Sequence, residues 1–186
     1  MKTHGEKQCF ALIGFRGCGK TTAGRELARL LGGECVDTDD LVAERAGRSI
    51  ADIFVNDAEV GFRKMESEVI GEVVQAPPAV ISVGGGAVLN QRNVEDLRAV
   101  ATVVWLTAPA DVLYQRISTD SETQHSRPPL TQQSGIEDVR RLLAERSPIY
   151  QRASDFQIET VDREPGEIAE EIVRCVRPPS SSQARG

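Results

Sequence analysis

A glycine-rich loop that lies between an apolar stretch and a helix-forming stretch constrains this chain more than any other feature. The loop reads GFRGCGKT at residues 14–21 and has the spacing G-x-x-x-x-G-K-[ST]. The apolar residues 9–13 precede it, and the helix-forming residues 22–31 follow it. A strand, a glycine loop and a helix in this order place backbone N–H groups around a phosphate, and the helix start adds partial positive charge. We therefore expect this loop to bind the phosphates of a nucleotide.

The last two residues of the loop have expected roles at those phosphates. Lys20 would reach the β- and γ-phosphates, and the hydroxyl of Thr21 would ligate Mg²⁺. Glycines are needed because a Cβ would clash with the phosphate oxygens or forbid the required backbone angles. The alternative is a glycine-rich turn that binds nothing, and the strand before the loop and the helix after it argue against that alternative.

Composition indicates a small globular protein. A length of 186 residues fits one domain with a sizeable core, and the net charge of −6 gives no overall attraction to nucleic acid or to an anionic membrane. No apolar run approaches the roughly 20 residues that cross a bilayer, and residues 1–8 do not resemble a signal peptide. Reduced thiols in the cytoplasm are the simplest account of the four scattered cysteines, Cys9, Cys18, Cys35 and Cys175.

Short apolar runs alternate with helical patterns, which predicts a parallel sheet with helices on both faces. Strands are expected over residues 10–13, 34–36, 79–83, 102–106 and 156–159. Helices are expected over residues 22–31, 41–46, 49–54, 60–74, 94–99, 109–118, 136–151 and 165–176. A single domain would occupy residues 1–176, and the Pro- and Ser-rich residues 177–186 are expected to be a disordered tail.

One polar stretch, residues 118–134, interrupts this alternation. Long polar segments inside compact domains are usually functional lids or are simply mobile. A lid would suit an enzyme that transfers a phosphoryl group, because such an enzyme must keep water away from the phosphate.

Carboxylates and glycines follow two of the expected strands. Asp37 and Asp39 come directly after the second strand, and three glycines at 84–86 come after the third. Ligands of such sheets lie at the carboxyl ends of the strands. One carboxylate could hold Mg²⁺ through water and the other could accept a proton from an attacking hydroxyl; a helix N-cap at Thr38 or Asp39 is the alternative. The glycines allow close approach to a small ligand, or they form a flexible turn.

Four arginines are candidates for binding anions. Arg63 has Glu66 three residues later, Arg146 lies near the end of a long helix, and Arg127 falls in the expected lid. Arg116 ends the helix after the fourth strand. Any one of them alone is more often a solvated surface charge. Phosphoryl transfer, however, requires fixed positive charge and planar groups that grip carboxylate or phosphate.

The order of these motifs resembles the shikimate kinase family, whose members are P-loop enzymes related to nucleoside monophosphate kinases. The matching segments are GFRGCGKT at 14–21, DTD at 37–39, GRSIADIF at 47–54, FRxxE at 62–66, GGG at 84–86, RPPL at 127–130 and ERSPIY at 145–150. They span about residues 9–175, and the set after the first loop is far more specific than the loop itself. One departure is Ala58, which stands before Glu59 where the family usually has glycine, and which we expect to alter only a turn.

The resemblance implies an α/β fold with three layers: a five-stranded parallel sheet of order 2-3-1-4-5, flanked by helices, with a lid. It implies a kinase that transfers the γ-phosphate of ATP to the 3-hydroxyl of shikimate, a step of aromatic amino-acid biosynthesis. A related kinase acting on another hydroxy acid, such as gluconate, is one alternative. A nucleotide-binding regulator that has lost catalysis is another.

The resemblance also implies roles for individual residues. Lys20, Asp39 and Arg127 would be catalytic, and Thr21 and Asp37 would hold Mg²⁺. The nucleotide would contact Gly17, Cys18, Gly19, Lys20, Thr21, Thr22, Arg116, Arg127 and Arg163. Shikimate would contact Asp39, Arg63, Gly84, Gly85, Gly86 and Arg146, with Glu66 orienting Arg63. The only expected partner is this small molecule, and the protein is expected to be a monomer.

Overall fold

The computed structural model describes residues 9–120 and 135–176. Most of the expected lid, including Arg127, and the expected tail at 177–186 lie outside the described residues. Five parallel strands form one sheet in the order β2-β3-β1-β4-β5, which confirms the expected topology. The strands are β1 (Cys9–Ile13), β2 (Cys35–Asp37), β3 (Val80–Ser82), β4 (Ala101–Thr107) and β5 (Phe156–Glu159).

The central strand explains why the sequence there is a continuous apolar run. β1 pairs with β3 on one side and with β4 on the other, so that Phe10 lies opposite both Val80 and Thr102. All five residues of β1 are buried. A strand covered on both faces has no solvent side, and therefore it does not alternate between apolar and polar residues.

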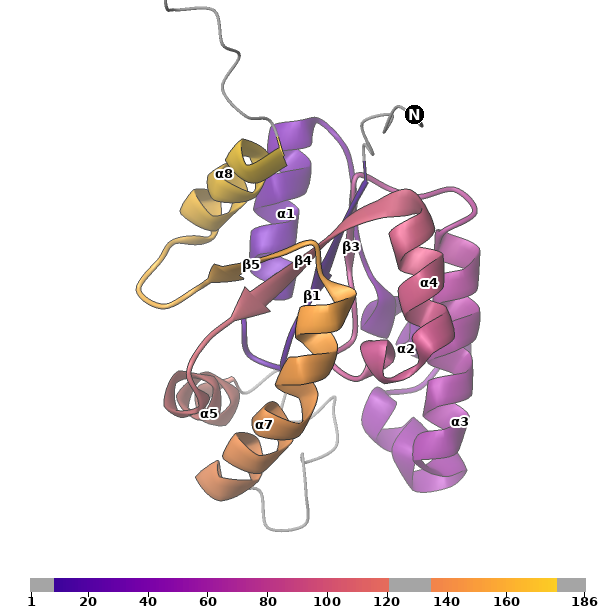
Figure 1. Ribbon diagram of the computed structural model, residues 1–186. Coiled ribbons are helices and arrows are strands. Elements are labelled where there is room, and N and C mark those ends of the chain that lie inside the picture. Colours follow the sequence, from indigo (N-terminus) through magenta and orange to yellow (C-terminus); the bar gives the residue numbers. More distant parts are fainter. Residues whose placement is uncertain (1–8, 121–134, 177–186) are drawn as a thin grey trace, which may run out of the picture.

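Helices cover both faces of the sheet and make the three expected layers (Figure 1). They are α1 (Lys20–Leu31), α2 (Thr38–Ala46), α3 (Ile50–Val73), α4 (Gln91–Val100), α5 (Ala110–Thr119), α7 (Ile136–Ala153) and α8 (Pro165–Val176). A short 3₁₀ helix, η1 (Ala87–Leu89), lies between β3 and α4. Among the described residues, no helix is long and apolar enough to span a bilayer.

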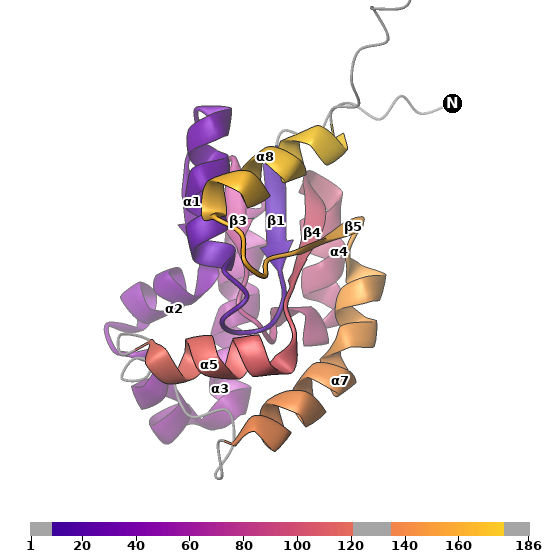
Figure 2. The ribbon, with the colours of Figure 1, turned by 90° about the vertical axis from the view of Figure 1, so that its left-hand side faces the viewer.

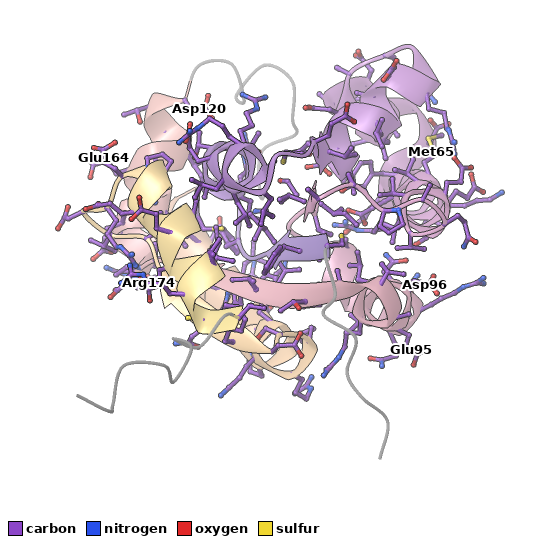
Figure 3. All side chains as sticks on the ribbon, turned by 90° about the horizontal axis from the view of Figure 1, so that it is seen from above. Met65, Glu95, Asp96, Asp120, Glu164 and Arg174 are labelled. Atoms are coloured by element: carbon purple, nitrogen blue, oxygen red, sulfur yellow. The ribbon has the colours of Figure 1, made fainter. Side chains whose placement is uncertain are left out.

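Two apolar clusters fix the layers. On one face, α1 and α8 pack on the sheet around Leu12, Leu27 and Ile172. On the other face, residues of α3, α4 and α7 pack against Ile13 and Ile81. Figure 3, viewed from above, shows Arg174 of α8 and Asp96 of α4 on opposite sides of the sheet. The helix α5 crosses the end of the sheet to which β1 points (Figure 2).

The element α3 consists of two helical segments joined at a kink, in agreement with the two helices expected at 49–54 and 60–74. It runs from Ile50 to Val73, but Ala58 has φ 55° and ψ −176°, which is not helical. Its start is capped by Ser49, whose side chain accepts a hydrogen bond from the backbone N–H of Asp52. Only glycine adopts such angles readily, so Ala58 strains the backbone at this bend. Alanine at this position therefore leaves the turn in place at an energetic cost.

Candidate active site

The carboxyl ends of the strands meet at the end of the sheet near α5 (Figure 2). A cavity of about 250 Å³ lies there, between the phosphate loop (residues 14–21), the start of α2 and the end of α5. It brings together most of the residues expected at the nucleotide and the metal. Those lining it are Gly17, Gly19, Lys20, Thr21, Thr22, Asp37, Asp39 and Arg116. Cys18, which was also expected at the nucleotide, lies in the same loop, but it is fully buried and does not line the cavity.

Three glycines give the phosphate loop its shape. Gly14, Gly17 and Gly19 all have positive φ, and a Cβ on Gly14 would meet the carbonyl oxygen of Leu106. The helix α1 begins directly after Gly19, so its first N–H groups face the loop. The Lys20 ammonium donates to the carbonyl oxygens of Gly14 and Phe15, each at 3.0 Å, and only 9% of this residue is exposed. The loop thus gathers positive charge in a concave backbone surface.

Asp37 connects three elements at the mouth of the cavity. Its Oδ2 accepts hydrogen bonds from the hydroxyls of Thr21, at 2.8 Å, and Ser82, at 2.9 Å. Its Oδ1 accepts from the backbone N–H of Asp39 and caps α2. The alternative cap at Thr38 or Asp39 is therefore wrong, because Asp37 is the last residue with extended backbone.

This set of oxygens fits a magnesium ion. Mg²⁺ prefers hard oxygen ligands and is usually held by one or two carboxylates together with substrate phosphates. Among the described residues, no group of three or more His, Cys, Asp or Glu side chains could hold a metal ion. A cation beside Asp37 and Thr21 would thus depend on phosphate oxygens and water for its remaining ligands.

The glycine turn, residues 84–86, is closed in by a different neighbour at each position. A Cβ on Gly84 would collide with the carboxylates of Asp39 and Glu66. A Cβ on Gly86 would collide with the guanidinium of Arg63. At Gly85 it would lie 3.4 Å from the phosphate loop. The turn therefore brings the phosphate loop, two carboxylates and an arginine to one place, and Thr38 anchors it by accepting a hydrogen bond from Gly84 N–H at 3.0 Å.

Arg63 is held by two carboxylates of its own helix. It donates to Glu66 at 2.7 Å and to Glu59 at 3.2 Å. Glu66 is only 1% exposed, and its Oε1 has no hydrogen-bond partner among the described residues. Burial raises the pKa of Glu66 to about 7; the positive charge of Arg63 opposes this shift, and nearby Asp39 adds to it. Glu66 orients Arg63, as expected, and it also presents a buried oxygen beside Asp39.

Arg146 approaches the site from α7. Its guanidinium lies over the ring of Phe15, 5.7 Å from the ring centroid. One helical turn later, the hydroxyl of Tyr150 donates to the carbonyl oxygen of Gly85 at 2.5 Å. The sequence analysis quoted Tyr150 within ERSPIY but gave it no role. The spacing of four residues from Arg146, which puts both on one helix face, could have pointed to it.

The remaining arginines lie at different distances from the cavity. Arg116 lines it and donates to the carbonyl oxygens of Gly17 and Thr160 at 3.3 and 2.9 Å. Arg163 is not brought to it, because its side chain pairs with Glu171 of α8 and donates to two carbonyl oxygens nearby. Thr160, which holds Arg116 in place, had no signal in the sequence analysis.

Comparison with known proteins identifies the family. The model of the family described as shikimate kinase matches residues 16–177. The chain belongs to the shikimate kinase family. A shikimate kinase of Rhodopirellula baltica is 40% identical over 173 residues, which cover 93% of this chain and 92% of the relative.

Solved structures of the family agree with the fold. The shikimate kinase of Acinetobacter baumannii, solved in complex with shikimate, has a TM-score of 0.83 and 35% identity, covering 90% of this chain and 91% of its own. The shikimate kinase of Aquifex aeolicus has a TM-score of 0.74 and 33% identity, covering 88% and 93% of the two chains.

Proposed function

We propose that this protein transfers the γ-phosphate of ATP to the 3-hydroxyl of shikimate, giving shikimate 3-phosphate and ADP, with Mg²⁺ as cofactor. The observation that carries the proposal is the glycine turn, which touches the phosphate loop, Asp39 and Arg63 at successive residues. It supports the proposal because a carboxylate that could accept a hydrogen bond from a hydroxyl and a guanidinium that could bind a carboxylate both lie close to the expected phosphate-binding loop.

The chemistry of shikimate matches these groups. Shikimate carries one carboxylate and three hydroxyls. Arg63 and Arg146 would bind the carboxylate, since planar guanidinium groups bind carboxylates in a fixed geometry. Asp39, only 6% exposed, would accept a hydrogen bond from the reacting hydroxyl and take up its proton during transfer. The backbone of the glycine turn would pack against the ring of shikimate.

The nucleotide side needs little covalent chemistry from the protein. Backbone N–H groups of the phosphate loop and the ammonium of Lys20 would neutralise the charge on the transferred group. Mg²⁺, held by Thr21 and Asp37, would supply further neutralisation of the phosphates. Arg116 and Arg127 complete the proposed nucleotide contacts. A monomeric protein in the cytoplasm remains part of this proposal.

An ADP-release assay tests the proposal with shikimate and gluconate as rival acceptors. We expect turnover with shikimate, much weaker turnover with gluconate, and none after Mg²⁺ is chelated. Preference for gluconate would favour the related-kinase alternative. ATP binding without turnover on either acid would favour a regulator.

Two variants test the residue roles. Asp39→Asn should lower kcat by about a hundredfold or more, because the proton acceptor is lost. Its control is Asp40→Asn, which removes the same charge from an exposed neighbour. Arg63→Ala should raise KM for shikimate, whereas Arg92→Ala, at an exposed position of α4, should not. Normal kinetics in both Asp39→Asn and Arg63→Ala would refute this assignment of the site.

A further inference from the structure

Tyr150 is a fully buried tyrosine whose hydroxyl reaches the substrate side of the site, the part made of Asp39, Arg63, the glycine turn and Arg146 that is proposed to bind shikimate. Its ring stacks on Trp105, with the centroids 5.8 Å apart, and its hydroxyl donates to the carbonyl oxygen of Gly85. The ring alone would fill the same space if it were phenylalanine. Packing therefore explains the aromatic ring but not the hydroxyl, which must have a partner when buried.

The acceptor of this hydroxyl belongs to the most crowded backbone of the site. Gly85 lies against the phosphate loop, Gly84 is anchored through its N–H to Thr38, and Gly86 abuts Arg63. These contacts come from the phosphate loop, α2 and α3. The bond from Tyr150 adds a fourth attachment, from α7, and it acts on the middle carbonyl of the turn.

Tyr150 also links the glycine turn to Arg146, because both residues lie on α7. Arg146 lies one helical turn before Tyr150, with its guanidinium over Phe15 of the phosphate loop. Burial raises the pKa of Tyr150 well above its usual value, and the charge of Arg146 only partly opposes that shift. The hydroxyl consequently stays protonated over the working pH range and remains a hydrogen-bond donor to Gly85.

We propose that Tyr150 is a positioning residue, whose hydroxyl fixes the distance between the glycine turn and Arg146 and so shapes the substrate side of the site. This inference rests on the proposed function, because it assigns to the turn and to Arg146 the task of holding shikimate. These contacts are made equally before and during phosphoryl transfer. Their loss should therefore appear mainly in KM for shikimate and much less in kcat.

The decisive variant is Tyr150→Phe, which removes one oxygen and keeps the stacked ring. We expect KM for shikimate to rise about five- to tenfold, the effect of one lost hydrogen bond. We expect kcat to fall less than about threefold and KM for ATP to stay unchanged, because Tyr150 does not line the cavity beside the phosphate loop. Calorimetric titration with shikimate measures its binding directly, without ATP.

Two control variants separate positioning from general loss of stability. Tyr114→Phe makes the same chemical change at the other tyrosine of the chain, on α5, and should leave KM for shikimate unaltered. Ile172→Val removes one buried methylene on α8, on the opposite face of the sheet, and should lower Tm about as much as Tyr150→Phe. It should do so without changing KM for shikimate.

Each outcome has a defined meaning. An unchanged KM for shikimate in Tyr150→Phe, an equal rise in KM for ATP, or the same rise in Ile172→Val would overturn the positioning role. Failure of Tyr150→Phe to fold would also overturn it, since the hydroxyl would then serve folding. A wild-type protein that neither binds nor phosphorylates shikimate would instead refute the proposed function.

Discussion

The phosphate side and the substrate side of the site are built in different ways. The phosphate side is one continuous segment, residues 14–21, whose backbone geometry creates the binding surface. The proposed substrate side combines Asp39 of α2, Arg63 of α3, the glycine turn and Arg146 of α7. The first depends on local backbone angles, whereas the second depends on how four separate parts of the chain pack together. Substitutions should therefore impair the two sides through different kinetic parameters.

The largest expected effect is on the phosphate side. Lys20→Ala removes the buried ammonium of the phosphate loop. We expect kcat to fall about a hundredfold or more, because developing charge on the phosphates loses a fixed cation. Shikimate binding, measured by calorimetric titration without ATP, should be retained. Loss of shikimate binding in this variant would show that the two sides do not act separately.

Glu66 gives the substrate side a pH dependence of stability. Its pKa is raised from 4.5 to about 7 in the folded protein. Below pH 4.5 it is protonated in both states, and as pH rises to about 7 only the unfolded chain releases the proton. The folded state consequently loses up to roughly 3 kcal/mol of stability across this window.

Urea unfolding at pH 4.5 and pH 7.5 measures this loss. Other carboxylates contribute to the total change, so the informative quantity is the difference between the wild-type protein and Glu66→Gln. We expect the variant to lose less stability over the same interval, because its amide does not titrate. If the free energy of unfolding depended on pH identically in the two proteins, burial would not raise the pKa of Glu66.

Gly84→Ala should mostly affect the substrate side. The new Cβ would collide with the carboxylates of Asp39 and Glu66, so we expect KM for shikimate to rise about tenfold or more and stability to fall by about 1–3 kcal/mol. The matched control is Gly71→Ala within α3, where a Cβ meets nothing within 4 Å. That change should stabilise the protein by about 0.5–1 kcal/mol. Thermal unfolding and shikimate kinetics of both variants check this contrast.

The smallest expected effect is at the bend of α3. Ala58→Gly should raise stability by about 1 kcal/mol, since relief of roughly 1–3 kcal/mol of backbone strain exceeds the entropic cost of glycine. The same change at Ala144, an exposed residue within α7, should lower stability by about 1 kcal/mol. Changes in Tm of opposite sign, an increase for Ala58→Gly and a decrease for Ala144→Gly, would support the assignment of strain. A lower Tm for Ala58→Gly than for the wild-type protein would contradict it.

The two sides also differ in how far the sequence predicts them. The phosphate loop could be placed from its glycine spacing together with the apolar run before it and the helical run after it, because all these determinants are adjacent in the chain. Alternating apolar and helical runs predicted a parallel sheet, but its strand order came from the resemblance to a family. Asp37 was expected near the metal, whereas its additional role as the cap of α2 became clear only from its backbone angles.

Contacts between distant segments explain what the sequence did not predict. The Tyr150 hydroxyl meets Gly85, which is 65 residues away in the chain, and no local pattern encodes that distance. Thr160 is another example, since it holds Arg116 from the loop after β5. Arg163 shows the reverse: the resemblance to a family implied a nucleotide contact, but in the described structure it pairs with Glu171.

The crowded main chain at residues 84–86 has a consequence for inhibitor design. A compound that hydrogen-bonds to the peptide groups of this turn would contact backbone atoms, which a substitution does not change. Resistance by substitution would require a side chain where Asp39, Glu66 and Arg63 already occupy the space. A substitution that prevents binding of such a compound would therefore also impair the enzyme.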